Sequence, residues 1–107
     1  KMEISVKELK EKIENGDKIM VDFWGQFCGP CKIMKPWFEK VANELNQQEG
    51  VKLYLFNIDK DREFVVNELG IRSVPTIKVF SEGKEVYNKS GVLKETEIMS
   101  LAQNYFE

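Results

Sequence analysis

The sequence contains no histidine and only two cysteines among its 107 residues. Without histidine, neither serine–histidine nor cysteine–histidine catalysis is available to this chain. Two cysteines alone cannot complete a tetrahedral zinc site of cysteine and histidine ligands, so no metal is expected. Only seven glycines occur, and no phosphate-binding loop or dinucleotide fingerprint is present, so no tightly bound nucleotide cofactor is expected.

The sequence also lacks an excess of basic residues and any long apolar run. Sixteen basic and eighteen acidic residues give a net charge of −2, which argues against a nucleic-acid surface or a polybasic membrane patch. No apolar run approaches the roughly 18 residues of a membrane span, and the charged first turns do not resemble a signal peptide. We therefore expect a soluble, cytoplasmic protein with neither nucleic acid nor membrane as a partner.

The pattern of apolar residues predicts one α/β domain over residues 1–107, since an apolar share of 42% suffices for a packed core. Strands are predicted at residues 2–4, 19–24, 51–57, 76–80 and 85–89, the last two forming a hairpin. Helices are predicted at 5–16, 31–45, 61–69 and around 98–105. Crossover helices imply parallel early strands, so we expect a mixed five-stranded sheet, or a four-stranded one without the N-terminal strand, with helices on both faces.

The two cysteines form the motif Cys28-Gly29-Pro30-Cys31, which follows an apolar strand and begins a predicted helix. A helix N-terminus carries partial positive charge and free N–H groups, so it stabilises a thiolate and lowers the thiol pKa. Because the thiolate attacks disulfides, Cys28 is predicted to form a mixed disulfide with a substrate. Cys31 lies one turn into the helix and is expected to be more buried and to resolve that mixed disulfide.

Two other roles of the cysteine pair remain open at this point. A purely structural disulfide is disfavoured, because a bridge across two residues closes a very small loop and removes little unfolded-state entropy. Half of a metal site shared between two chains is a further alternative.

Four segments of the chain resemble the thioredoxin family in the family's own order. They are VDFWGQFCGPCK at residues 21–32, NID at 57–59, GIRSVPT at 70–76, and the stretch 80–86. The resemblance covers nearly the whole chain and combines the cysteine motif, its strand context and Val74-Pro75-Thr76. It implies a thioredoxin fold and a thiol–disulfide oxidoreductase that reduces disulfides in client proteins.

The resemblance also implies roles for individual residues. Pro75 would follow a cis peptide bond and face Cys28, although an ordinary loop proline would be the simpler interpretation of the residue alone. An extended substrate segment would pair with the backbone of Val74 in edge-strand recognition. The residues implied to form the substrate-binding surface around the dithiol are Phe27, Gly29, Pro30, Val74, Pro75, Gly91 and Val92.

The partners and cofactors implied by the resemblance are simple. The substrates would be disulfide-containing proteins, and a thioredoxin reductase with electrons from NADPH or ferredoxin would recycle the chain. No bound cofactor is implied besides the redox-active disulfide Cys28–Cys31, and the chain is expected to be a monomer.

Asp22 interrupts an otherwise apolar strand six residues before Cys28. Its apolar neighbours Val21 and Phe23 disfavour an exposed carboxylate at a strand end. The resemblance implies a buried aspartate that exchanges a proton with Cys31. Desolvation without a neighbouring cation is expected to raise the pKa of Asp22, so that the carboxylate can accept a proton and later return it.

Three residues depart from the family's pattern. Phe27 replaces the tryptophan usual before the first cysteine, which keeps apolar area but loses the indole N–H donor. Leu55 replaces the lysine that commonly accompanies the buried aspartate. Lys94 replaces a helix cap such as serine, so the last helix is expected to start with a weaker cap.

Three functions compete at the level of sequence. A protein-disulfide reductase is favoured, because Gly29-Pro30 lacks the histidine that oxidants and isomerases of secreted proteins usually carry between their cysteines. An oxidant or isomerase is the second interpretation. A binding module, recruited as a subunit of a larger machine, is the third.

Overall fold

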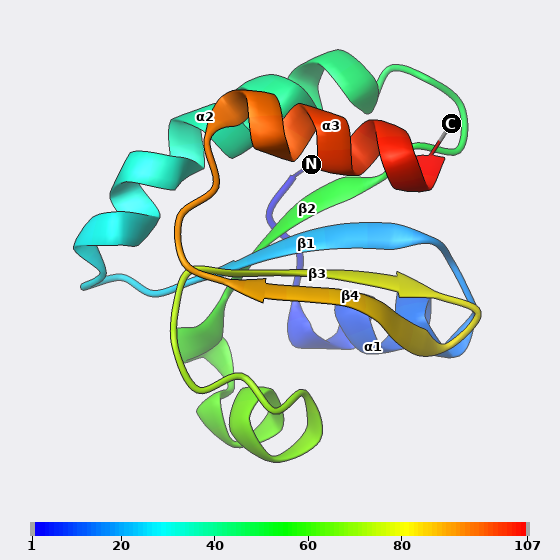
Figure 1. Ribbon diagram of the computed structural model, residues 1–107. Coiled ribbons are helices and arrows are strands. Elements are labelled where there is room, and N and C mark those ends of the chain that lie inside the picture. Colours follow the sequence, from blue (N-terminus) through cyan, green and yellow to red (C-terminus); the bar gives the residue numbers. More distant parts are fainter. Residues whose placement is uncertain (1, 107) are drawn as a thin grey trace.

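A computed structural model describes residues 2–106 and contains a four-stranded sheet with helices on both faces (Figure 1). The strands are β1 (Ile19–Trp24), β2 (Leu53–Asn57), β3 (Thr76–Ser81) and β4 (Lys84–Ser90), in the spatial order β2-β1-β3-β4. The α-helices are α1 (Val6–Glu14), α2 (Gly29–Leu45) and α3 (Glu95–Phe106). β1 and β2 are parallel, and β3 is antiparallel to both β1 and β4. The predicted mixed α/β sheet is therefore confirmed.

Different segments cover the two faces of the sheet, so the central strand β1 is buried on both sides (Figure 1). On one face, Met20 belongs to an apolar cluster formed with α2 and α3. On the other face, Val21 packs in a cluster with α1 and the segment 58–68. Because successive strand residues point to opposite faces, both sets of β1 side chains need to be apolar, and Asp22 is the exception.

The predicted N-terminal strand is absent, so the sheet takes its four-stranded form within residues 2–106. Glu3 forms only an isolated parallel bridge with Leu55, with Ile4 N–H donating to the Leu55 carbonyl and Leu55 N–H to the Met2 carbonyl, each at 3.0 Å. A single bridge is too short to count as a strand, although it covers the outer edge of β2. β2 itself begins at Leu53 rather than Val51, because Val51 is engaged in a turn with its N–H on the Gln48 carbonyl.

The segment predicted as one short helix at 61–69 has a different geometry. A 3-10 turn over Ile58–Lys60 is followed by a π-helix over Phe64–Glu68. Leu69 N–H donates to the Phe64 carbonyl five residues earlier, at 3.2 Å, which is the wider π spacing. Apolar periodicity cannot distinguish this spacing from an α-helix over so few residues. The position of the predicted helix is therefore confirmed, and its π geometry is a finding of the structure.

The sequence correctly predicts the start of α1 and the turn between β3 and β4. Ser5 and Glu8 form a reciprocal capping box at the start of α1. Glu82 and Gly83 join β3 to β4 with φ of 55° and 81°, the pair of positive angles that a two-residue type I′ turn requires. The capping box fixes where α1 begins, and the turn fixes the register of the β3–β4 hairpin.

The start of α3 confirms the weak cap predicted at Lys94. The Lys94 N–H donates to the Glu97 carboxylate at 2.8 Å, which is one of the two hydrogen bonds of a capping box. The other needs a hydroxyl side chain at the cap position, which lysine lacks. Ile98 and Ala102 point into the core from this helix, as their spacing predicts.

The longest helix, α2, carries the cysteine motif at its first turn. Pro30 lies in that first turn, where its missing N–H costs no helical hydrogen bond, and Pro36 lies inside the helix. Within residues 2–106, none of the helices combines the length and the apolar character needed to cross a bilayer.

Candidate active site

Cys28 and Cys31 form a disulfide at the N-terminus of α2, with their Cα atoms 5.3 Å apart. Cys28 is the N-cap residue of the helix and is partly exposed, whereas Cys31 is only 2% exposed. The Cys31 N–H points at the Cys28 Sγ atom at 3.1 Å. A thiolate at Cys28 would accept that N–H and face the positive end of the helix dipole, and both lower a thiol pKa. The predicted difference in burial between the two cysteines is confirmed.

Three loops meet at the edge of the sheet that carries the disulfide, and they precede α2, β3 and α3 (Figure 1). The Cys28 Sγ atom lies 3.6 Å from the Val74 carbonyl oxygen. The Val74–Pro75 peptide bond is cis, as the resemblance predicts. Gly91, at φ +100°, donates its N–H to the Pro75 carbonyl at 2.9 Å and so joins the third loop to the second. The third loop is also held to α2, since Leu93 N–H lies 3.4 Å from the sulfur of the buried Met34.

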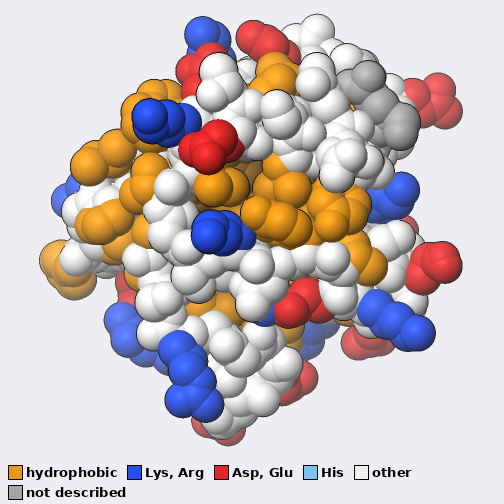
Figure 2. Space-filling view, viewed as in Figure 1, with side chains coloured by type: hydrophobic (Ala, Val, Ile, Leu, Met, Phe, Trp, Pro, Cys, Tyr) orange, Lys and Arg blue, Asp and Glu red, His pale blue; other side chains and the backbone are white. Residues whose placement is uncertain are grey.

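Large apolar side chains are exposed on the loop before Cys28, on the loop before α3 and in the segment after β2. Phe27 is 92% exposed, and Val92 and Val66 are exposed by 41% and 49%. Figure 2 shows hydrophobic side chains gathered at the end of the molecule where the chain enters α2. Such exposure of large apolar groups marks a surface for contact with other molecules.

A groove of about 300 Å³ opens beside Cys28, and only part of the predicted surface lines it. Phe27 and Val74 line the groove together with Cys28, whereas Gly29, Pro30, Gly91 and Val92 lie exposed on the surface outside its lining. The opposite wall comes from the irregular segments 58–66 and 71–73, which the sequence did not single out as a binding wall. The lining residues on that wall are Ile58, Asp59, Arg62, Val65, Val66, Ile71, Arg72 and Ser73.

Asp22 is fully buried in β1, as predicted, and its Cα partner across the ladder is Leu55. Within the described residues neither of its carboxyl oxygens has a hydrogen-bond partner. Burial raises the pKa of Asp22 to about 7, and the nearby charge of Glu3, with a smaller contribution from Glu39, acts in the same direction. The Lys35 ammonium opposes them. Asp22 can therefore gain and lose a proton near neutral pH.

The expectation that no cation stands near Asp22 was wrong. Lys35 lies on α2 with its ammonium 4.8 Å from the centre of the Trp24 ring, and the Trp24 indole N–H donates to the Glu3 carboxylate at 3.3 Å. The signal was present in the spacing: Cys31, Lys35 and Glu39 follow one another at intervals of four and therefore share one face of α2. The expectation considered only Leu55 on β2 and did not include the helix α2 packed on that face of β1.

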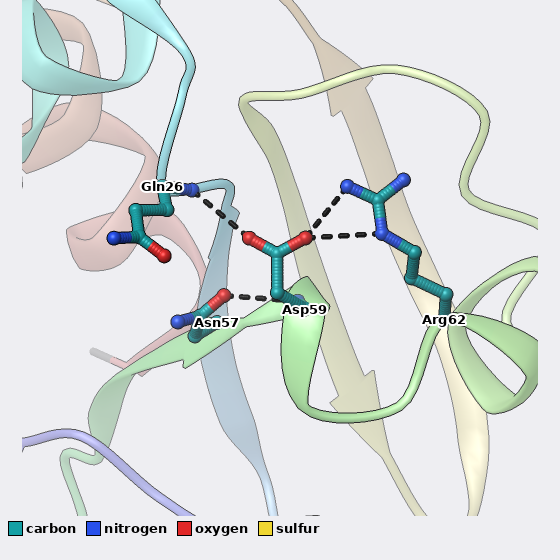
Figure 3. A network of polar contacts seen from close by, with 4 residues as sticks. All are labelled: Gln26, Asn57, Asp59 and Arg62. Atoms are coloured by element: carbon teal, nitrogen blue, oxygen red, sulfur yellow. Dashed lines mark hydrogen bonds and ion pairs between the residues drawn. The ribbon is translucent and has the colours of Figure 1, made fainter.

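A polar network fixes the chain just before the disulfide (Figure 3). The Asp59 carboxylate accepts the Gln26 N–H on one oxygen at 3.1 Å and the Arg62 guanidinium on the other at 3.0 and 2.6 Å. The Asp59 N–H in turn donates to the Asn57 side chain at 2.9 Å. The Gln26 hydrogen bond first, and Arg62 second, hold the pKa of Asp59 below its usual value. Asp59 thereby connects the irregular segment after β2 to the loop that ends at Cys28.

Residues 2–106 contain no group of three or more histidine, cysteine, aspartate or glutamate side chains placed to hold a metal ion. The groups that the structure does bring together at this end of the sheet are the disulfide, the buried Asp22 carboxyl group and exposed apolar side chains.

Comparisons with known proteins agree on one family. The thioredoxin family model matches residues 1–104. A thioredoxin of Mycoplasma genitalium is 37% identical over 100 residues, covering 94% of each chain, and one of Rickettsia prowazekii is 37% identical over 89 residues, covering 83% of this chain and 82% of the relative. Among solved structures, a thioredoxin of Malassezia sympodialis superimposes with a TM-score of 0.84 at 25% identity, covering 99% of this chain and 93% of that one. Chloroplastic thioredoxin z gives 0.80 at 28% identity, with coverage of 97% and 92%.

Proposed function

Because this chain belongs to the thioredoxin family and is a thiol–disulfide oxidoreductase, we propose that Cys28 is its nucleophile and Cys31 its resolving cysteine. The Cys28 thiolate attacks one sulfur of a substrate disulfide, and the other substrate sulfur leaves and takes up a proton. The Cys31 thiolate then attacks the Cys28 sulfur of the mixed disulfide. This releases the substrate sulfur that was bound to Cys28, and that sulfur is protonated in turn. The substrate gains two electrons and two protons, and the chain is left with the Cys28–Cys31 disulfide.

Asp22 is proposed to accept the Cys31 proton when Cys31 becomes the attacking thiolate. Its burial and its pKa of about 7 support this role, since a base is most effective when its pKa is near the working pH. In the reverse direction, the protonated carboxyl group returns its proton to the Cys31 sulfur.

The substrate is proposed to dock as an extended segment against Val74, next to Pro75. Two observations support this: the Val74 carbonyl lies 3.6 Å from the Cys28 sulfur, and no backbone acceptor in residues 2–106 takes the Val74 N–H. A segment paired there would bring its disulfide to Cys28. Phe27, Gly29, Pro30, Gly91 and Val92 would supply the apolar contacts around it.

Family membership implies disulfide-containing protein substrates and a reductase that recycles the oxidised chain. We propose further that residues 1–107 form a single thioredoxin domain that acts as a monomer. We also propose that the reductase draws its electrons from NADPH or ferredoxin and that the protein works in the cytoplasm, where the glutathione and thioredoxin systems keep thiols reduced. The reduced dithiol of Cys28 and Cys31 carries the two electrons, so the proposed reaction needs no bound cofactor.

The observation that carries the proposal is the exposure of Cys28, and not of Cys31, at the N-terminus of α2. Two measurements test it. The chain should reduce insulin disulfides with dithiothreitol as electron donor, and its reduction potential should lie near the value of about −270 mV measured for thioredoxin. A potential near about −180 mV would instead indicate an oxidant or isomerase. The absence of insulin reduction would favour a binding module.

A further inference from the structure

The groove beside Cys28 is lined by apolar side chains and by three charged residues. Ile58, Val65 and Ile71 provide apolar surface, and Phe27 borders the groove next to the disulfide. The π-helix Phe64–Glu68 contributes to this wall. A surface of this kind fits a peptide segment with apolar side chains, and its charged groups decide which segments fit well.

Two of the three charged residues that line the groove neutralise each other. Asp59 and Arg62 form an ion pair through one carboxylate oxygen, and the other oxygen is taken by the Gln26 N–H. The Asp59 carboxylate is therefore already satisfied and offers little to a ligand. The Asp59–Arg62 pair adds no net charge to the groove.

Arg72 is the third charged residue, and it leaves the groove with a net positive charge. Its side chain is exposed and makes neither an ion pair nor a hydrogen bond with any other residue of the range 2–106. The chain as a whole carries a net charge of −2, so this local charge differs in sign from the molecule around it.

Arg72 lines the same groove as Cys28 and lies close along the chain to the backbone that contacts the Cys28 sulfur. Arg72 lies two residues before Val74, whose carbonyl oxygen is 3.6 Å from the Cys28 sulfur. Two residues of chain span at most about 7 Å, so the Arg72 backbone is within about 7 Å of Val74. The long Arg72 side chain can therefore reach a residue two or three positions from the cysteine of a segment that lies along Val74.

We propose that this groove selects protein disulfides whose cysteine is flanked, within about three residues, by an aspartate or glutamate that pairs with Arg72. The inference rests on the proposed function and names the class of substrate for that same site. The planar guanidinium can bind a carboxylate with two parallel hydrogen bonds, so it gives an acidic side chain both attraction and orientation. A lysine at the same substrate position would face a like charge and bind less well.

The test uses peptides that each carry one cysteine activated as a 2-pyridyl disulfide. The residue two positions before the cysteine is glutamate, glutamine or lysine, and a second series carries it two positions after. The Cys28 thiolate of the reduced protein attacks the peptide sulfur and releases pyridine-2-thione, whose absorbance gives the rate. Cys31 then releases the peptide thiol and leaves the protein disulfide. The readout is the ratio of glutamate to glutamine rates within each protein variant.

In at least one series, the glutamate peptide should react about two- to fivefold faster than the glutamine peptide at low salt, the range of a partly exposed ion pair. The lysine peptide should be the slowest. The preference should disappear near 1 M salt, where the Debye length is about 3 Å. It should disappear in Arg72→Gln and reverse in Arg72→Glu, and both variants change an exposed side chain.

The matched control is Lys84→Gln, which removes one positive charge at the β3–β4 hairpin and should keep the wild-type ratio. Equal rates for all peptides, or a preference that survives Arg72→Glu, would overturn the inference while leaving the proposed function intact. Failure to react with any peptide would instead contradict the proposed function, and the inference with it.

Discussion

Asp22 and Leu55 are paired across the parallel β1–β2 ladder, and both side chains are buried. The Leu55 side chain can neither carry a charge nor donate a hydrogen bond, so it does nothing to stabilise a carboxylate beside it. The pKa of Asp22 is raised to about 7, chiefly by burial. The proton-carrying role proposed for Asp22 rests on this burial and on the raised pKa that it causes.

The pH dependence of stability should reveal Asp22 directly. Between about pH 4 and pH 7 the folded chain holds a proton on Asp22 that the unfolded chain releases, so the free energy of unfolding should fall as pH rises through that range and then level off. The shift spans roughly 3 pH units, which corresponds to about 4 kcal/mol. Asp22→Asn should remove this decrease and stabilise the fold near neutral pH, because no buried charge is then required.

Denaturant unfolding of the oxidised protein across pH is the measurement, since the cysteines of the disulfide do not titrate. Asp17→Asn removes a carboxyl group from an exposed position and serves as the control, with the wild-type decrease retained. A destabilised Asp22→Asn variant at pH 7, with unchanged rates of disulfide reduction, would make Asp22 a structural residue instead.

Lys35 and Glu39 should move the pKa of Asp22 in opposite directions. Lys35→Met removes a cation that lowers this pKa and should raise it further, whereas Glu39→Gln removes an anion and should lower it. Carbon-13 NMR titration of the Asp22 carboxyl group measures both changes. Lys32→Met, an exposed position on the same helix, is the control. Shifts of the same sign in the two variants would contradict the assignment.

Asp59 should protect the Gln26 amide, in the loop before Cys28, from hydrogen exchange. Asp59→Asn removes the charged acceptor of the Gln26 N–H and the partner of Arg62, so hydrogen exchange at Gln26 should accelerate several-fold. In the wild type, this protection should be present at neutral pH and be lost only as pH falls through the lowered pKa of Asp59. Exchange at Gln26 that is unchanged in Asp59→Asn would show that other contacts hold the loop.

Lys78 and Glu85 form an ion pair that the sequence pattern did not predict. The Lys78 side chain is 2% exposed and that of Glu85 is 40% exposed. Glu85→Gln should destabilise the fold by about 1–2 kcal/mol, because it leaves a buried ammonium without its counter-charge while solvent reaches the glutamate side. Lys78→Met should be neutral or stabilising in the same unfolding experiment. A stable Glu85→Gln variant beside an unstable Lys78→Met variant would reverse this account.

The sequence correctly predicted β1 and the β3–β4 turn, which depend on the residues of those segments themselves. β1 matches the predicted 19–24 because its residues alternate between two buried faces, and the β3–β4 turn matches because Gly83 favours a positive φ. The redox pair and the buried Asp22 stood out because their residue types are unusual at those positions. The roles of Cys28 and Cys31 were predicted from their place at a helix N-terminus, whereas proton exchange between Asp22 and Cys31 was implied only by the resemblance to a family. The comparisons show that the chain belongs to that family.

Features that depend on how separate helices and strands pack together were not predicted from the sequence. Lys35 and Glu39 affect Asp22 from α2, which packs on that face of β1, and the buried Lys78 pairs with Glu85 on the neighbouring strand. The π-helical segment leaves no periodic signature over five residues. The wall of the groove beside Cys28, Arg72 included, comes from two irregular segments whose position relative to Cys28 is set by the whole fold.

The division of roles between Cys28 and Cys31 is tested most directly by trapping. Cys31→Ser and Cys28→Ser are each reduced, incubated with a disulfide-containing protein and analysed by mass spectrometry without reducing agent. The exposed Cys28 should attack in Cys31→Ser and remain joined to the substrate, because the resolving thiol is gone. Cys28→Ser should form no adduct, because Cys31 is buried. Adducts formed equally by both variants, by neither, or by Cys28→Ser alone would contradict the proposed mechanism.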